Sequence, residues 1–295
     1  MDDQKNFMMA MALSALVLIG YWVFIGEPTA KKAREAAQAE IAATQSIEPE
    51  TLPIAIKPRE ELLQAGQRIK IETPSLSGSF QTDGMRLDDI QLKDYDKTLD
   101  PADGKVILLV PEGAERSAYI MDNWTGVDGG TGSNTPWQVV SGGTLTPTSP
   151  ISLRHDIGNI VIERTVSVDD KFLITLTDKL TNTGSGDATL SRKGYSRQHE
   201  LPDDLTNFFI IQEGPISVVD SKYHDMKYKG VKKKNGWNES GESGWVGLTD
   251  KYWLQAAIAP QGRNMTAEYD YKLINDQEVY ESSYTLDPLT ITPGT

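Results

Sequence analysis

Residues 7–25 contain no charged side chain, and this run constrains the chain more than any other feature. Counted from 7 to 25 it holds 19 residues, which as an α-helix would span about 28 Å, close to the hydrocarbon thickness of a bilayer. Tyr21, Trp22 and Phe24 gather at its C-terminal end, where aromatic side chains meet a membrane interface. The run therefore predicts a transmembrane anchor over residues 1–26.

A cleaved signal peptide is the alternative interpretation of this run. Signal peptides have shorter apolar regions, of about 7–15 residues, and end at a small-x-small cleavage site. Here Gly26, Glu27, Pro28 and Thr29 follow the apolar run without such a site. The longer run and the missing site favour an uncleaved anchor.

A linker is predicted for residues 27–60. Residues 30–45 are rich in Ala, Lys and Glu, which favours helix, but they show little apolar stripe. Pro49, Pro53 and Pro58 then interrupt any helix. We expect a solvated spacer between the anchor and a folded domain that occupies residues 61–295.

From residue 68 the apolar side chains recur at every second position, which is typical of strands with one buried face. The inner-face residues expected from this pattern are Ile69 and Ile71; Ile160, Ile162, Val166 and Val168; Phe172, Ile174, Leu176 and Leu180; and Ala267, Tyr269, Tyr271 and Leu273. Further strands are predicted at 106–110, 252–259 and 279–286, and a hairpin turn at 168–171. Many strands separated by short turns predict a mainly β fold, a large antiparallel sandwich.

Composition excludes several classes of function. The chain has no cysteine, so it can form neither disulfides nor thiolate zinc sites. Its net charge of -13 disfavours nucleic acid as a partner, because binding phosphates requires a basic surface. No cofactor is predicted.

No catalytic constellation emerges either. His155, His199 and His224 are far apart in the sequence and lack the spacing of metal ligands, so we expect surface or turn histidines. The glycine-rich stretch at 126–132 lacks the Lys-Ser/Thr ending of a phosphate-binding loop and predicts an ordinary loop.

Two adjacent carboxylate pairs are poor candidates for acid–base chemistry. Neighbouring residues on a strand point to opposite faces, so Asp88 with Asp89, and Asp203 with Asp204, are expected to be solvated turn carboxylates.

One basic cluster interrupts the acidic chain. Its members, which we predict as possible partner or lipid contacts, are Lys227, Lys229, Lys232, Lys233 and Lys234. They could meet anionic lipid headgroups or an acidic partner, although a solvated loop between strands is the plainer interpretation.

Several segments, in order along the chain, resemble bacterial YidC membrane protein insertases in their alphaproteobacterial form. They are MDDQKNF at 1–7 with the apolar helix that follows, IETPSLSGS at 71–79, RLDDIQLKDY at 86–95, ERTVSVDD at 163–170, EGPI at 213–216 and GLTDKYW at 247–253. Ordered matches over this length are more specific than any single motif.

The resemblance implies an inner-membrane protein with a cytoplasmic N-terminus and a periplasmic β-supersandwich similar to sugar-mutarotase domains. It implies nascent membrane proteins as clients and the Sec translocon and the bilayer as partners, with an insertase and chaperone role but no enzyme activity. The family's five-helix insertion core follows the periplasmic domain. After residues 7–25, this sequence has no second apolar run long enough for a membrane-spanning helix. We therefore expect an N-terminal part whose sandwich is incomplete at residue 295, and we assign no residue of the insertion core to this chain.

Two alternatives remain open from the sequence. A membrane-anchored carbohydrate-binding or mutarotase-like protein would use stacking aromatics, with candidates Trp124, Trp137, Trp237, Trp245 and Trp253. A periplasmic chaperone or Sec-contact module would act through the sandwich surface, for which the basic cluster is the candidate.

Overall fold

The computed structural model describes residues 56–126, 129–202, 205–206, 211–234 and 236–294. The chain divides into two compact units, residues 1–50 and 51–295, and the description concerns the second. The predicted anchor and the predicted linker up to residue 55 lie outside the described residues, as do Asp203 and Asp204. Within the described part, no helix has the length and apolar character needed to cross a bilayer.

The described unit is built almost entirely from strands. Its elements in chain order are α3 (Arg59–Leu62), β1 (Arg68–Glu72), β2 (Leu76–Gln81), η2 (Asp83–Met85), β3 (Arg86–Asp96), η3 (Pro101–Asp103), β4 (Lys105–Leu109), β5 (Ala118–Gly126), β6 (Gly129–Gly130), β7 (Gln138–Ser141), β8 (Thr144–Leu145), β9 (Ile151–Ile157), β10 (Ile160–Val168), β11 (Ile174–Asn182), β12 (Ala188–His199), β13 (Gly214–Val219), β14 (Lys222–Asp225), α4 (Tyr228–Lys234), β15 (Trp237–Gly241), β16 (Gly244–Thr249), β17 (Leu254–Ile258), β18 (Met265–Ile274), β19 (Gln277–Leu286) and β20 (Leu289–Ile291).

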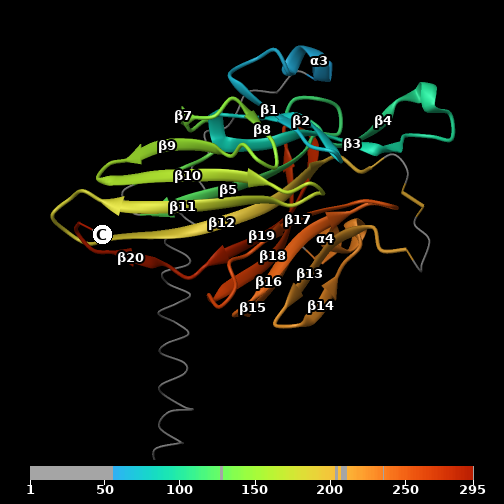
Figure 1. The fold of residues 1–295 in the computed structure, drawn as a ribbon. Helices are drawn as coiled ribbons and strands as arrows, with labels where there is room; N and C mark the ends of the chain where they lie inside the picture. The colour runs from blue at the N-terminus through green and yellow to red at the C-terminus, as the bar shows by residue number, and fades with distance from the viewer. Residues whose placement is uncertain (1–55, 127–128, 203–204, 207–210, 235, 295) are drawn as a thin grey trace, which may run out of the picture. The chain divides into compact units, whose positions relative to one another are not determined.

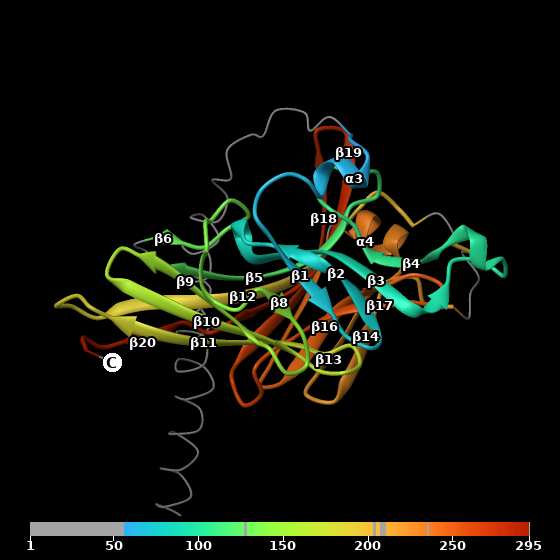
Figure 2. The ribbon, with the colours of Figure 1, turned by 45° about the horizontal axis from the view of Figure 1, so that its top comes forward.

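These strands form one large sheet and two small ones. The large sheet has the order β15-β18-β19-β12-β5-β3-β2-β1-β8, with β20 on β12, β4 on β3 and β6 on β5. The small sheets have the orders β11-β10-β9-β7 and β14-β13-β16-β17. In Figures 1 and 2, β9, β10 and β11 lie beside β5 and β12, while β13, β14 and β16 lie at the other end of the unit. Pairing is antiparallel except between β1 and β8. The predicted mainly β sandwich is confirmed.

Two hydrophobic clusters hold the small sheets against the large one. The first joins β1, β2, β3 and β5 to β9 and β10, and includes Ile71, Phe80 and Ile162. The second joins β18 and β19 to β13, β16 and β17, and includes Val246 and Ala267. Ile120 of β5 packs against both clusters. Both small sheets therefore cover the same face of the large sheet, each over a different half.

The period-two pattern predicts most inner faces correctly. Ile69 and Ile71 are buried, and so are all four predicted residues of β10. The hairpin between β10 and β11 is confirmed, with Val168 paired to Ile174. Its loop is longer than predicted, because Asp169 Oδ1 accepts the main-chain N–H groups of Lys171 and Leu173 at 2.9 and 3.0 Å.

Two predicted inner-face residues are wrong. Phe172 lies in the turn before β11 and is 52% exposed, because the Asp169 turn postpones the start of the strand to Ile174. Leu273 is 61% exposed and lies next to the turn of the β18–β19 hairpin, where Ile274 pairs with Gln277. Ala267 and Tyr269, nearer the middle of β18, are buried as predicted.

Candidate functional site

The histidines do not come together as a metal or catalytic site. His155 Nδ1 lies 3.0 Å from the carbonyl oxygen of Pro136, and the His224 ring lies 4.7 Å from that of Trp237. His199 is buried beside Tyr119, contrary to the predicted surface position, and burial lowers its pKa. Among the described residues, no group of three or more His, Asp or Glu side chains is arranged to hold a metal ion.

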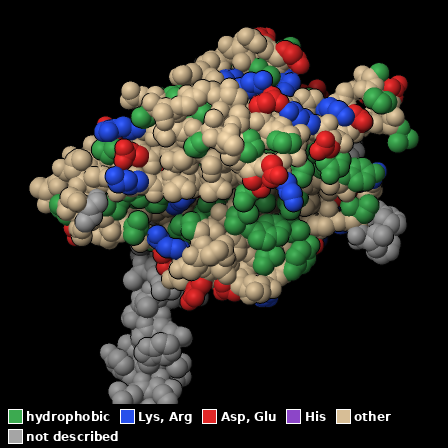
Figure 3. All heavy atoms as spheres, in the orientation of Figure 1, with side chains coloured by type: hydrophobic (Ala, Val, Ile, Leu, Met, Phe, Trp, Pro, Cys, Tyr) green, Lys and Arg blue, Asp and Glu red, His purple; other side chains and the backbone are tan. Residues whose placement is uncertain are grey.

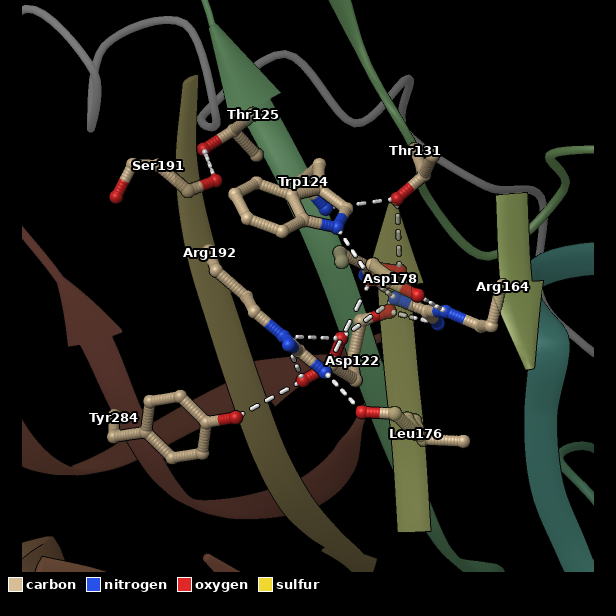
Figure 4. Close-up of polar contacts among 11 residues, drawn as sticks. Asp122, Trp124, Thr125, Thr131, Arg164, Leu176, Asp178, Ser191, Arg192 and Tyr284 are labelled. Atoms are coloured by element: carbon tan, nitrogen blue, oxygen red, sulfur yellow. Dashed lines mark hydrogen bonds and ion pairs between the residues drawn. The ribbon is translucent and has the colours of Figure 1, made fainter. Parts of the chain in front are cut away.

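A buried charge network lies where β10 and β11 pack on the large sheet (Figure 4). Arg164 of β10 donates to both carboxylate oxygens of Asp178 of β11, at 2.7 and 2.6 Å. It also donates to the side chain and the main-chain carbonyl of Asp122 of β5, at 2.8 and 2.9 Å. The three side chains are 0%, 1% and 8% exposed. One guanidinium thus joins two sheets.

Arg192 of β12 balances the second carboxylate of this network. Its Nε lies 2.9 Å from each carboxylate oxygen of Asp122, whose Oδ2 also accepts a hydrogen bond from the Tyr284 hydroxyl at 3.0 Å. The Trp124 indole donates to Asp178 Oδ2 at 2.6 Å. Two arginines therefore face two aspartates, and the buried group is electrically neutral.

The charges in this network determine the ionisation of its acids. Burial acts to raise the pKa of Asp178, but hydrogen bonds and charges from Arg164 and Arg192 hold that pKa below its usual value. Burial and the neighbouring Asp122 carboxylate raise the pKa of the Tyr284 hydroxyl, which stays protonated and donates. Buried and paired in this way, these groups join β10 and β11 to β5 and β12, and removing one partner would leave an uncompensated buried charge.

The sequence does contain a pattern that predicts this network: a charged residue on the buried face of each of two strands. Arg164 occupies the buried parity of β10, between Ile162 and Val166. Asp178 lies on the inner parity of β11, two positions after Leu176. A charged residue on the apolar face of each of two strands joined by a hairpin indicates a buried cross-strand ion pair.

The prediction for Asp88 and Asp89 is wrong. Both lie in β3 with 0% and 4% exposed. Arg68 and Arg86 pair with Asp88, and Arg59 of α3 pairs with Asp89. Arg68 Nε also donates to Ser79 Oγ, and that hydroxyl donates to Asp89 Oδ2, so the two carboxylates share one network of partners and neither is solvated.

A second buried ion-pair group centres on Glu281 of β19. Lys193 lies 2.7 Å from its Oε1, and Arg197 lies 2.6 Å from its Oε2. Burial acts to raise the pKa of Glu281, but the two cations hold it far below the usual range.

Three of the five candidate tryptophans pack within the protein instead of forming a sugar-stacking platform. Trp124 and Trp137 are buried, and the guanidinium groups of Arg192 and Arg164 lie over their rings at 5.6 and 4.8 Å. Trp237 stacks on Tyr269 with ring centroids 4.5 Å apart. These contacts give the three rings packing partners within the protein.

The basic cluster lies on the short helix α4 and the residue before it, where the sequence favoured a loop. Tyr228 and Val231 anchor the helix with their buried side chains. Lys232 pairs with Glu278 of β19 and lies over the Tyr271 ring at 5.3 Å. Lys229, Lys233 and Lys234 are exposed.

The sheet β14-β13-β16-β17 has an apolar outer face. Strand register places Tyr223, Val218, Trp245 and Ile258 in one row across the sheet, and Ile216, Gly247 and Ala256 in the next. Their neighbours in sequence, among them Ser217, Val246 and Ala257, point inward and are buried. Figure 3 shows a continuous group of hydrophobic side chains on this side of the molecule. This face and α4 form the candidate interaction surface.

Comparison with known proteins agrees with the sequence resemblance. A sequence profile of the YidC periplasmic domain matches residues 68–295. Proteins named membrane protein insertase YidC are 36% identical in Maricaulis maris (99% of this chain, 51% of that protein), 31% in Bradyrhizobium diazoefficiens (100% and 52%) and 33% in Cereibacter sphaeroides strain ATCC 17029 (100% and 50%). The chain therefore spans about half the length of the curated relatives it matches.

Among solved structures, the Slr1438 protein from Synechocystis sp. PCC 6803 aligns at 10% identity with a TM-score of 0.38, covering 78% of this chain and 92% of that chain. A likeness this weak supports no conclusion. The sequence relatives, in contrast, align from end to end of the chain, and the profile covers nearly all of the folded unit. The chain belongs to the YidC family of membrane protein insertases and contains the family's periplasmic domain.

Proposed function

We propose that this chain is the anchored periplasmic part of a membrane protein insertase, which assists the insertion and folding of inner-membrane proteins. The supporting observation is the end-to-end similarity to proteins named membrane protein insertase YidC, at 31–36% identity. That similarity includes residues 1–67, which precede the periplasmic profile match and contain the predicted anchor.

In this proposal the chain has three parts with separate tasks. Residues 1–26 anchor it in the inner membrane with the N-terminus in the cytoplasm, residues 27–60 form a spacer, and residues 61–295 form the periplasmic sandwich. The sandwich is a rigid scaffold, since its buried ion pairs are neutral and tie its sheets together. The insertion step itself belongs to the half of the relatives that this chain does not match. Nascent membrane proteins are the proposed clients, and Sec translocon subunits the proposed partners.

Reporter fusions test the topology. We expect alkaline phosphatase fused after residue 295 to be active, and green fluorescent protein fused there to stay dark, because the first folds in the periplasm and the second does not. A matched chain without residues 7–25 should reverse both signals. A fluorescent fusion of the unaltered chain would contradict the proposed topology.

Complementation tests the function. A chimera in which this chain replaces the aligned half of the Maricaulis maris insertase should support growth of a strain depleted of its own insertase. The chain alone should not. Growth with the chain alone, or no growth with a chimera that accumulates normally in the membrane, would contradict the division of tasks proposed here.

A further inference from the structure

The outer face of the sheet β14-β13-β16-β17 departs from the usual pattern of an antiparallel sheet. Such a sheet normally buries one face and shows polar side chains to water on the other. Here the inner face is buried against the large sheet, yet the outer face shows Tyr223, Trp245, Leu254 and Ile258. Tyr223, Leu254 and Ile258 are 54%, 44% and 56% exposed. An exposed apolar patch spread over neighbouring strands indicates a docking surface.

The face is continuous with little interruption by charge. Leu254 lies over Gly247, so the centre of the face is covered by an aliphatic side chain where the glycine has none. At the outward positions set by the strand register, the one carboxylate among the described residues is Asp225, on the edge strand β14. The rest of this outer face is therefore better suited to contact with an apolar partner than with water.

Helix α4 borders the end of this face at which β17 begins. The Tyr228 hydroxyl donates to the carbonyl oxygen of Thr249 at 3.2 Å, and Thr249 is paired with Leu254. The main-chain N–H of Met226, which precedes the helix, donates to the carbonyl oxygen of Pro215 at 3.0 Å. These contacts place α4, with its exposed lysines, at the end of the small sheet where β17 begins.

The kind of cation distinguishes a lipid surface from a protein surface. The stretch 227–234 contains five lysines and no arginine. Protein–protein interfaces are enriched in arginine and depleted in lysine, whereas lysine stems lie along apolar surface and place the ammonium among headgroups. Each lysine near an anionic membrane contributes a favourable interaction. In a chain of net charge -13, such a local cluster also offsets repulsion from anionic lipid.

The predicted anchor brings a bilayer within reach of this face. Residues 26–55 separate the apolar run from the described residues, and a chain segment of that length reaches at most about 100 Å whatever its conformation. Tethering makes docking an intramolecular event, so even a weak affinity suffices.

We propose that this face, together with Lys229, Lys233 and Lys234, docks on an anionic lipid bilayer and holds the sandwich against the membrane. Trp245 and Tyr223 enter the headgroup region, where aromatic rings are favoured, and the lysines contact lipid phosphates. The proposal rests on the anchored topology proposed above, but not on insertase activity.

Fluorescence quenching in proteoliposomes tests the docking. Because the chain has no cysteine, Ile258→Cys introduces a single thiol for a bimane label in the full-length chain. The matched control is Thr177→Cys, an exposed strand position on β11. In vesicles containing phosphatidylglycerol and headgroup spin-labelled lipid, we expect strong quenching at 258 and little at 177. Equal quenching at the two positions would overturn the proposal.

Charge and lipid composition provide the second readout. Replacing Lys229, Lys233 and Lys234 with Gln should lower the docking equilibrium constant on the order of a hundredfold, as should vesicles of phosphatidylcholine alone. If neither the lysine substitutions nor the change of lipid alters the quenching, anionic lipid is not what the face binds. If lipid never quenches the label but purified Sec translocon shields it, the occupant is a protein and the proposal fails.

Flotation of the chain with the vesicles tests the predicted anchor separately in the same experiment. A chain that floats with the vesicles without quenching at 258 keeps the proposed topology and overturns only the docking. A chain that does not float overturns the anchor itself.

Discussion

Arg164 of β10 and Asp178 of β11 occupy directly opposed positions in their hairpin and form a two-point ion pair whose side chains are 0% and 1% exposed. The same guanidinium reaches Asp122 of β5 in the large sheet. The pair therefore fixes both the register of the hairpin and its attachment to the large sheet.

Removing this guanidinium should destabilise the domain strongly. Arg164→Met leaves Asp122 and Asp178 facing Arg192 alone, and breaking a buried ion pair from one side costs about 3–5 kcal/mol of unfolding free energy. Urea denaturation followed by tryptophan fluorescence measures the change. Arg154→Met is the matched control, because Arg154 pairs with Asp156 at an exposed position of β9 and should have little effect. Similar losses in both variants would contradict the role assigned to Arg164.

The buried acids should make the domain acid-sensitive. The pKa values of Asp178 and Glu281 are lowered in the folded state, so their stabilising contribution is present above the unfolded pKa values of about 4. It is lost as the pH falls below that value toward the folded pKa values. Urea unfolding between neutral and acidic pH should show this decline, and Asp178→Asn should weaken it. An identical pH dependence in the variant would remove Asp178 from the explanation.

Gly194 of β12 is required by the ring of Tyr284. A Cβ at position 194 would lie 2.4–2.6 Å from the ring atoms and the hydroxyl of Tyr284. Gly194→Ala should therefore displace the ring from its hydrogen bond with Asp122 and cost about 1–3 kcal/mol by overpacking. Thermal unfolding tests this, with Gly186→Ala, which meets nothing within 4 Å, as the control. The cost should largely vanish in a Tyr284→Val background; an unchanged cost would show that the ring is not the cause.

Arg59 should be part of the folded unit, although it lies within the predicted linker. Its side chain pairs with the buried carboxylate of Asp89, and the main-chain N–H of Lys57 donates to the carbonyl oxygen of Gly113 at 2.9 Å. Arg59→Met leaves a buried carboxylate short of one partner, which costs about 1–3 kcal/mol. The control is Glu60→Gln, whose side chain is 81% exposed. If both variants unfold at the same urea concentration as the unaltered chain, the folded unit begins after Arg59.

The strands and the buried faces could be predicted because strand periodicity is local. Ile160, Ile162, Val166 and Val168 repeat every second residue, and the pleat alone puts such residues on one face. Phe172 shows where this reasoning ends. The Asp169 side chain captures two main-chain N–H groups and adds residues to the turn, so the apolar side chain falls outside the strand.

The partners of the charged residues could not be predicted in the same way. Asp88 and Asp122 carry no mark in the sequence that distinguishes them from solvated carboxylates. Arg68, which pairs with Asp88, lies 20 residues away in the chain, and Arg164, which pairs with Asp122, lies 42 residues away; strand pairing and sheet packing that no local pattern specifies bring them together. The position of Arg164 on the buried face of β10 indicates that a charge is buried there, but it does not indicate which carboxylates neutralise that charge.

The sequence by itself determined the apolar run, the β class, the positions of most strands and the family, because each depends on residue types at fixed local spacing. Only the tertiary structure decided which charges pair, that α4 lies beside the β17 end of a small sheet, and that the outer face of that sheet is apolar. The physical reason is that sheet faces and ion pairs are shared between strands distant in the chain, and their composition exists only once register and packing are set.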